Sequence, residues 1–75
     1  MNYYDRITSD PNVMLGKPVI KGSRITVELI LRKIGGGYSF EEILEMYPHL
    51  NKEDILAAVN YAASVLGSEE TLQTV

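Results

Sequence analysis

The sequence predicts a mainly α-helical fold, in which an N-terminal β-hairpin precedes three helices. Two observations predict it. Residues with β preference lie on both sides of Lys21-Gly22-Ser23, where a glycine can adopt the positive φ of a tight turn. Apolar residues then recur at helical spacing in three later segments, which Gly35-Gly36-Gly37 and Pro48 separate from one another.

The predicted hairpin pairs residues 18–20 with residues 24–27, and a further short strand is expected over residues 5–8. A two-stranded hairpin is marginally stable alone, so it needs support from the helices or from a second copy of the chain. The chain has 75 residues and no cysteine, so its core is small and no disulfide can supplement it. We therefore expect a homodimer, formed partly through the N-terminal strands and the hairpin.

The first two predicted helices have recognisable ends. Thr26 is a suitable N-cap for the first helix, and the glycine triplet ends it because glycine accepts the left-handed conformation of a C-cap. The second helix begins at a capping box formed by Ser39 and Glu42. Its apolar stripe follows the spacing i, i+3, i+4 and i+7, through Phe40, Ile43, Leu44 and Tyr47.

The third helix is expected to follow Pro48 closely, with Asn51 as its N-cap and Gly67 as its C-cap. Glu53 and Asp54 lie in its first turn, where acidic side chains suit the positive end of the helix dipole. The predicted buried seam consists of Ile55, Val59, Ala62 and Leu66, helped by Leu56 and Ala63. This gives a single domain over residues 1–67, with strands and hairpin in 1–27, a three-helix unit in 26–67 and a flexible tail in 68–75.

Charge is divided between the two halves of the chain. Residues 1–33 hold six basic and three acidic side chains, a balance of +3, whereas residues 34–75 hold one basic and seven acidic side chains, a balance of -6. Such a division lets the first half approach an anionic partner and the second half a basic one. The alternative is a coincidence of solvated faces.

The sequence holds no pattern typical of an enzyme or a metal site. His49 has no cysteine or second histidine to join it, so we interpret it as a turn residue, and Glu41, Glu42 and Glu45 as a solvated acidic face. We predict no catalytic activity, no metal and no cofactor. No apolar segment reaches the roughly 20 residues of a membrane span, and the N-terminus lacks the features of a signal peptide, so a cytoplasmic location without membrane contact is expected.

Two helices joined by a brief turn are the outline of a helix-turn-helix, whose last helix enters the DNA major groove. The third helix suits that role poorly, because it would present Glu53 and Asp54 to a groove lined by phosphates. If DNA is bound, we expect the contacts to come from a β-ribbon of two paired hairpins that carries Lys17, Lys21 and Arg24.

Four stretches of the chain carry a family resemblance: Asp10-Pro11-Asn12, the string from Gly16 to Ile25, Gly37-Tyr38-Ser39, and the string from Ile43 to Leu50. Over roughly residues 5 to 65 the chain resembles the small prokaryotic family called domain of unknown function 433. The resemblance implies a homeodomain-like three-helix fold behind a β-hairpin. For many members it also implies a role as a VapB-type antitoxin beside a nuclease-like toxin with a PIN-type fold, and it implies no enzyme activity.

We therefore predict an antitoxin that binds and neutralises a PIN-like nuclease toxin and that can also bind operator DNA. Two alternatives stay open: a stand-alone helix-turn-helix DNA-binding regulator, and a homodimeric interaction module without nucleic-acid binding. A neighbouring nuclease-like gene favours the antitoxin. Salt-sensitive binding to upstream DNA favours the regulator, and neither observation favours the interaction module.

Overall fold

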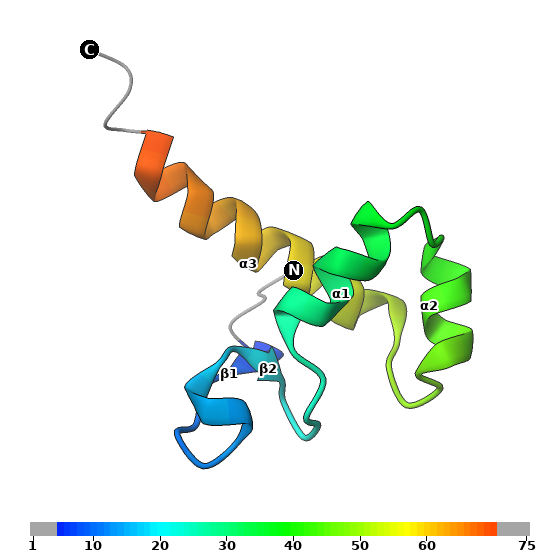
Figure 1. Cartoon of the computed structure of the whole chain (residues 1–75), viewed down its shortest axis with the longest axis horizontal. Coiled ribbons are helices and arrows are strands. Elements are labelled where there is room, and N and C mark those ends of the chain that lie inside the picture. Colours follow the sequence, from blue (N-terminus) through cyan, green and yellow to red (C-terminus); the bar gives the residue numbers. More distant parts are fainter. Residues whose placement is uncertain (1–4, 71–75) are drawn as a thin grey trace.

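A computed structural model describes residues 5–70 and has a mainly helical architecture behind a small antiparallel β pair, as the sequence predicts (Figure 1). Its elements, in chain order, are β1 (Ile7–Thr8), the short 3-10 turn η2 (Met14–Gly16), β2 (Val19–Ile20), α1 (Val27–Gly35), α2 (Phe40–Met46) and α3 (Lys52–Glu70). The helix α3 lies against α1, α2 and β1, so it joins the N-terminal strands to the other two helices.

The β pair differs from the predicted hairpin in its second strand. β2 pairs with β1, placing Ile20 opposite Ile7, whereas Thr26 meets Val19 only through an isolated bridge. Around that bridge, the Ile20 N–H donates to the Ile25 carbonyl over 2.9 Å. The chain leaves the sheet at this point because Thr26 is already the N-cap of α1. Residues 24–27 therefore contribute one bridge to β2 and no strand of their own.

The predicted turn at Gly22 is present. The Ser23 N–H donates to the Ile20 carbonyl over 3.0 Å, and Gly22 has a φ of +82°. Positive φ at the third residue of a four-residue turn is the geometry of a type II turn. The Ser23 hydroxyl completes it, donating to the Ile20 carbonyl over 2.8 Å and accepting from the Ile25 N–H over 3.0 Å. Ser23 thus stabilises the turn.

The predicted ends of the first helix are confirmed. The Thr26 hydroxyl accepts from the Leu29 N–H over 3.0 Å. At the other end Gly37 has a φ of +97°, its N–H donates to the Ile34 carbonyl over 3.0 Å, and the Tyr38 N–H donates to the Lys33 carbonyl over 3.1 Å. These two bonds form a Schellman motif, which requires the left-handed glycine.

The predicted capping box of the second helix is also confirmed. The Glu42 N–H donates to the Ser39 hydroxyl over 3.1 Å, and the Ser39 N–H donates to the Glu42 carboxylate over 2.8 Å. The helix α2 buries Ile43 completely. Ile43 belongs to a core that gathers side chains from β2, the three helices and the segments before α1 and α3: Ile20, Ile25, Val27, Ile30, Ile43, Leu50, Ile55 and Ala58.

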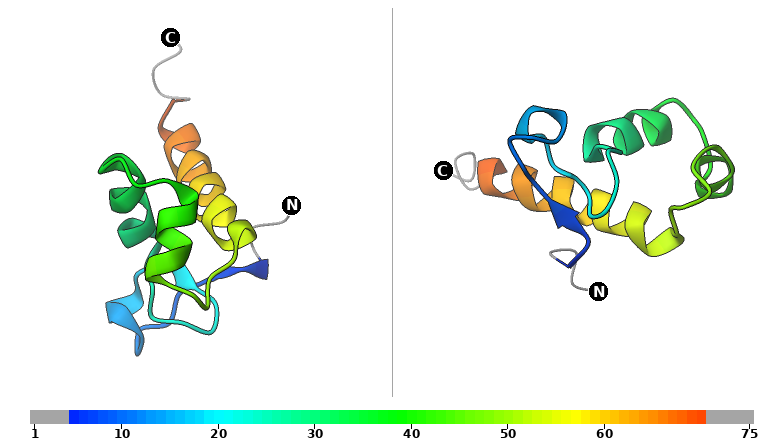
Figure 2. Two further views of the ribbon diagram at one scale, coloured as in Figure 1. Left: turned by 90° about the vertical axis from the view of Figure 1, so that its right-hand side faces the viewer. Right: turned by 90° about the horizontal axis from the view of Figure 1, so that it is seen from below.

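The third helix corrects two predictions. It continues through Gly67 to Glu70, so Gly67 is not its C-cap. The predicted seam is buried only at its start, because Val59 is 38% and Leu66 56% exposed. Figures 1 and 2 show the reason: α1 and α2 cover the first half of α3, and the second half projects beyond them. The predicted tail is thus helical up to Glu70, and residues 71–75 lie outside the described part of the chain.

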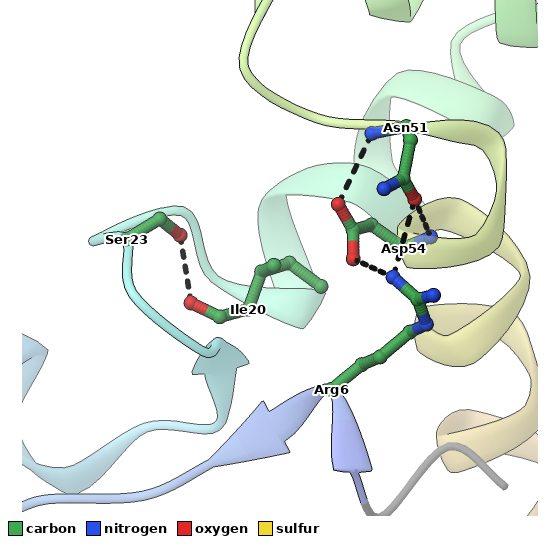
Figure 3. A network of polar contacts seen from close by, with 5 residues as sticks. All are labelled: Arg6, Ile20, Ser23, Asn51 and Asp54. Atoms are coloured by element: carbon green, nitrogen blue, oxygen red, sulfur yellow. Dashed lines mark hydrogen bonds and ion pairs between the residues drawn. The ribbon is translucent and has the colours of Figure 1, made fainter.

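A polar network fixes the start of α3 to the N-terminal segment (Figure 3). Asn51 and Asp54 form a reciprocal capping box: the Asp54 N–H donates to Asn51 Oδ1 over 2.9 Å, and the Asn51 N–H donates to Asp54 Oδ2 over 3.1 Å. From the residue before β1, Arg6 Nη1 donates to Asp54 Oδ1 over 3.0 Å and to Asn51 Oδ1 over 3.3 Å. The Arg6 carbonyl also accepts from the Lys21 N–H over 2.8 Å. Arg6 therefore links α3, β1 and the Gly22 turn.

The replacement Asp54→Ala tests this network. We expect it to lower the free energy of unfolding by about 2 kcal/mol, because it removes a helix cap and leaves Arg6 without its carboxylate. The matched control is Glu53→Ala in the same helical turn, where the side chain is exposed and a change within about 0.5 kcal/mol is expected. Urea denaturation measures both variants, and equal losses would show that the network contributes nothing specific.

The replacement Gly22→Ala tests the turn. No atom lies within 4 Å of the added Cβ, so any loss of stability reflects the positive φ alone and is expected to be about 1–2 kcal/mol. Gly35→Ala is the control, since its Cβ also meets no atom within 4 Å and its φ is not positive. That variant should be neutral or more stable in thermal melting. A wild-type melting temperature for Gly22→Ala would contradict the turn assignment.

Candidate functional site

The basic residues predicted to contact DNA lie in and beside the turn that follows β2. We call residues 17–24 the basic turn. The structure does not give its three cations equivalent surroundings. Lys17 Nζ lies 2.9 Å from Glu28 Oε1 on α1 and forms an ion pair with that carboxylate.

Glu28 holds a second cation as well. Arg32, one helical turn later, donates from Nε and Nη2 to Glu28 Oε2 over 3.2 and 3.1 Å. The hydrogen bond from Lys17 and those from Arg32 hold the pKa of Glu28 below its ordinary value of 4.5. Glu28 is therefore anionic at neutral pH. Both ion pairs persist until the pH falls through the lowered pKa of Glu28. Because all three side chains are about half exposed or more, the pairs fix geometry more than they add stability.

Lys21 and Arg24 are different. Both are exposed, and neither forms an ion pair with another of the residues 5–70. Glu28, an acid four residues further along the chain, is held by Lys17 and Arg32 and not by Arg24. Arg24 instead borders a shallow hollow of about 340 Å³. Two of the three predicted cations thus remain available to an anionic partner.

The outward side of the helix-turn-helix outline is acidic. Residues 47–51 join α2 to α3. On α2 the side chains of Glu41, Glu42 and Glu45 are exposed, and the first turn of α3 adds exposed Glu53 beside Lys52. We call α2 and the first turn of α3 the acidic helix pair. A duplex approaching it would meet a surplus of carboxylates, which repel phosphate groups.

Sequence reasoning missed the conformation of the loop before β2. Met14 and Leu15 have φ of 49° and 59°, and Gly16 follows at 82°. Left-handed backbone costs a non-glycine residue roughly 1–2 kcal/mol. Asp10 supports the loop, since its carboxylate accepts from the Asn12 N–H over 2.8 Å. Leu15 in this loop is 93% exposed. In the sequence, only Gly16 and the turn-forming residues before it indicate a loop at this place.

The described residues offer no metal-binding cluster. No group of three His, Asp or Glu side chains within residues 5–70 could hold a metal ion. His49 is exposed in the connection between α2 and α3. None of the helices described is long and apolar enough to cross a membrane. Three surfaces distinguish the described part of the molecule: the basic turn, the acidic helix pair, and an apolar groove between α1 and α3.

Comparisons with known proteins agree with this architecture. The chain is 38% identical over 56 residues to an uncharacterized protein, y4eO, of Sinorhizobium fredii; the match covers 75% of this chain and 25% of that protein. It also resembles the crystal structure of a DUF433 member protein from Anabaena variabilis, with a TM-score of 0.78 and 29% identity over 88% of this chain and 65% of that one.

The chain therefore spans about a quarter of the length of the curated relative and about two thirds of the solved chain. The family model described as "Protein of unknown function (DUF433)" matches residues 7–62. This match begins at β1 and ends within α3, and so includes the basic turn and the acidic helix pair. On this evidence the chain belongs to the DUF433 family.

Proposed function

We propose that the protein is an antitoxin that binds and neutralises a nuclease-like toxin with a PIN-type fold. The observation that carries the proposal is the acidic helix pair. A nuclease that cleaves RNA must present cations to the phosphates of its substrate. Carboxylates displayed on rigid helices complement such a surface and compete with RNA for it.

Local structure holds these carboxylates in place. The capping box at Ser39 fixes the start of α2, and the Asn51–Asp54 box fixes the start of α3. Ile43 and Ile55 anchor the two helices in the core with no exposed surface. The exposed glutamates are therefore carried on backbone that is already ordered before a partner arrives, which lowers the entropic cost of binding.

Coexpression with a PIN-type nuclease encoded beside the gene tests the proposal. The wild-type protein should restore growth and form a stable complex with the nuclease. The double replacement Glu41→Lys/Glu45→Lys should weaken that complex by about tenfold or more, with the larger loss at low salt. Asp5→Lys, an exposed acid outside the acidic helix pair, is the control and should bind as the wild type does.

A nuclease that stays fully active with an excess of this protein would contradict the antitoxin role. An unchanged affinity for the nuclease after the two charge reversals would contradict the acidic helix pair as the binding surface, since the complex would then not depend on it.

A second role, binding of operator DNA, is favoured by the two unpaired cations of the basic turn. Lys21 and Arg24 flank Gly22 and are both exposed. Two copies of the turn on a dimer would supply cations to phosphates without requiring the acidic helix pair to enter a groove. This route makes the turn, rather than the start of α3, the DNA-contacting element.

Fluorescence anisotropy on the DNA upstream of the gene, measured between 50 and 200 mM salt, tests this second role. Lys21→Ala and Arg24→Ala should each weaken binding to all sequences and reduce the slope of log affinity against log salt by about 1. Lys52→Ala in the first turn of α3 should leave both quantities unchanged. A loss confined to Lys52→Ala would assign DNA contact to the helix-turn-helix instead, and would exclude the basic turn.

A further inference from the structure

An apolar groove runs between α1 and the second half of α3. It has a volume of about 500 Å³, and its walls include Val27 and Leu31 from α1 and Ala62, Val65 and Leu66 from α3. Its charged lining residues are Glu28 and Arg32. These two already bind each other across 3.1 Å, so the groove is suited to an apolar occupant.

The second half of α3 contributes an apolar ridge beside this groove. Val65 is 48% and Leu66 56% exposed. Figures 1 and 2 show this part of the helix projecting beyond α1 and α2. A helical segment of fewer than about 12 residues is marginally stable in water on its own, and Gly67 inside it costs about 1 kcal/mol relative to alanine. The projecting segment therefore needs a packing partner.

The geometry points to a second copy of this chain as that partner, with the second half of each α3 seated in the groove of the other copy. The groove and the ridge lie side by side on the same surface, so a two-fold axis brings the ridge of each copy to the groove of its partner. No second protein with a matching shape is required.

Charge supports the same occupant. Glu28, which lines the groove, binds both Lys17 and Arg32, so this cluster of three side chains carries one net positive charge. The C-terminal end of a helix carries a partial negative charge. The incoming end of a partner's α3 is therefore attracted to this cluster. A dimer would also supplement the core, which is small because the chain has 75 residues and no cysteine to form a disulfide.

This dimer differs from the one expected from the sequence, which used the N-terminal strands and the hairpin. In the structure β2 lies between β1 and the bridge at Thr26, so one edge of the β pair is partly occupied within the chain. The apolar groove lies between α1 and α3 instead, and α3 exposes Val65 and Leu66 beside it. Dimerisation through these helices leaves the acidic helix pair and the basic turn for other partners.

Light scattering and sedimentation of the isolated protein between 1 and 100 µM test the inference. The wild type should reach twice its 8.4 kDa chain mass in this range. Leu66→Lys should weaken the dimer at least tenfold, because the charged lysine would be buried in the groove of the partner copy. Lysine suits the last turns of a helix, so the replacement should preserve α3. Leu15→Lys is the matched control: Leu15 is 93% exposed and does not line the groove, so this variant should dimerise like the wild type.

A cross-linking experiment avoids dependence on the folding of the lysine variant. Because the chain has no cysteine, Leu66→Cys introduces a single thiol that a short bis-maleimide should join between two copies. Leu15→Cys should not cross-link under the same conditions. A wild-type protein that is monomeric at 100 µM would overturn the inference, and so would a Leu66→Lys dimer of wild-type stability. Since no nuclease or DNA is present, these outcomes test the dimer itself and not the binding of a nuclease or of DNA.

Discussion

The side chain and carbonyl of Arg6 make the connection on which the rest of this fold depends. The guanidinium meets the capping box at the start of α3, and the carbonyl of the same residue holds the Lys21 N–H at the end of β2. A two-residue β pair has little stability of its own. Anchored at Arg6, it becomes part of the helical core, with Ile20 and Ile25 packed among the helices.

This anchoring separates the molecule into surfaces with different chemistry. The acidic helix pair displays carboxylates on rigid backbone, whereas Lys21 and Arg24 stand on a turn that Ser23 and Gly22 hold in one conformation. The described part of this chain thus presents exposed carboxylates on its helices and exposed cations on its turn. Each surface suits a different class of partner, and opposite fields of this kind steer association before contact is made.

The structure also explains why a helix-turn-helix outline need not imply DNA reading by its last helix. The turn of residues 47–51 and the two caps supply the geometry of the motif. Sequence readout in the major groove needs donors and cations at the start of the recognition helix. Here Asp54 is turned inward to Arg6, Glu53 remains outside, and Lys52 is the single cation of that turn. The outline is retained, while most of the charged side chains that it exposes are acidic.

The sequence by itself determined the local features: the turn at Gly22, the caps at Thr26 and Ser39, and the glycine end of α1. Each depends on bonds between residues at most five positions apart, so the residue types suffice. The tertiary structure alone decided that β2 pairs with β1, that Arg6 meets Asp54 across 48 positions, and that Lys17 forms an ion pair with Glu28. It also decided the exposure of Leu66, because helical spacing marks an apolar face but does not reveal where the covering helices end.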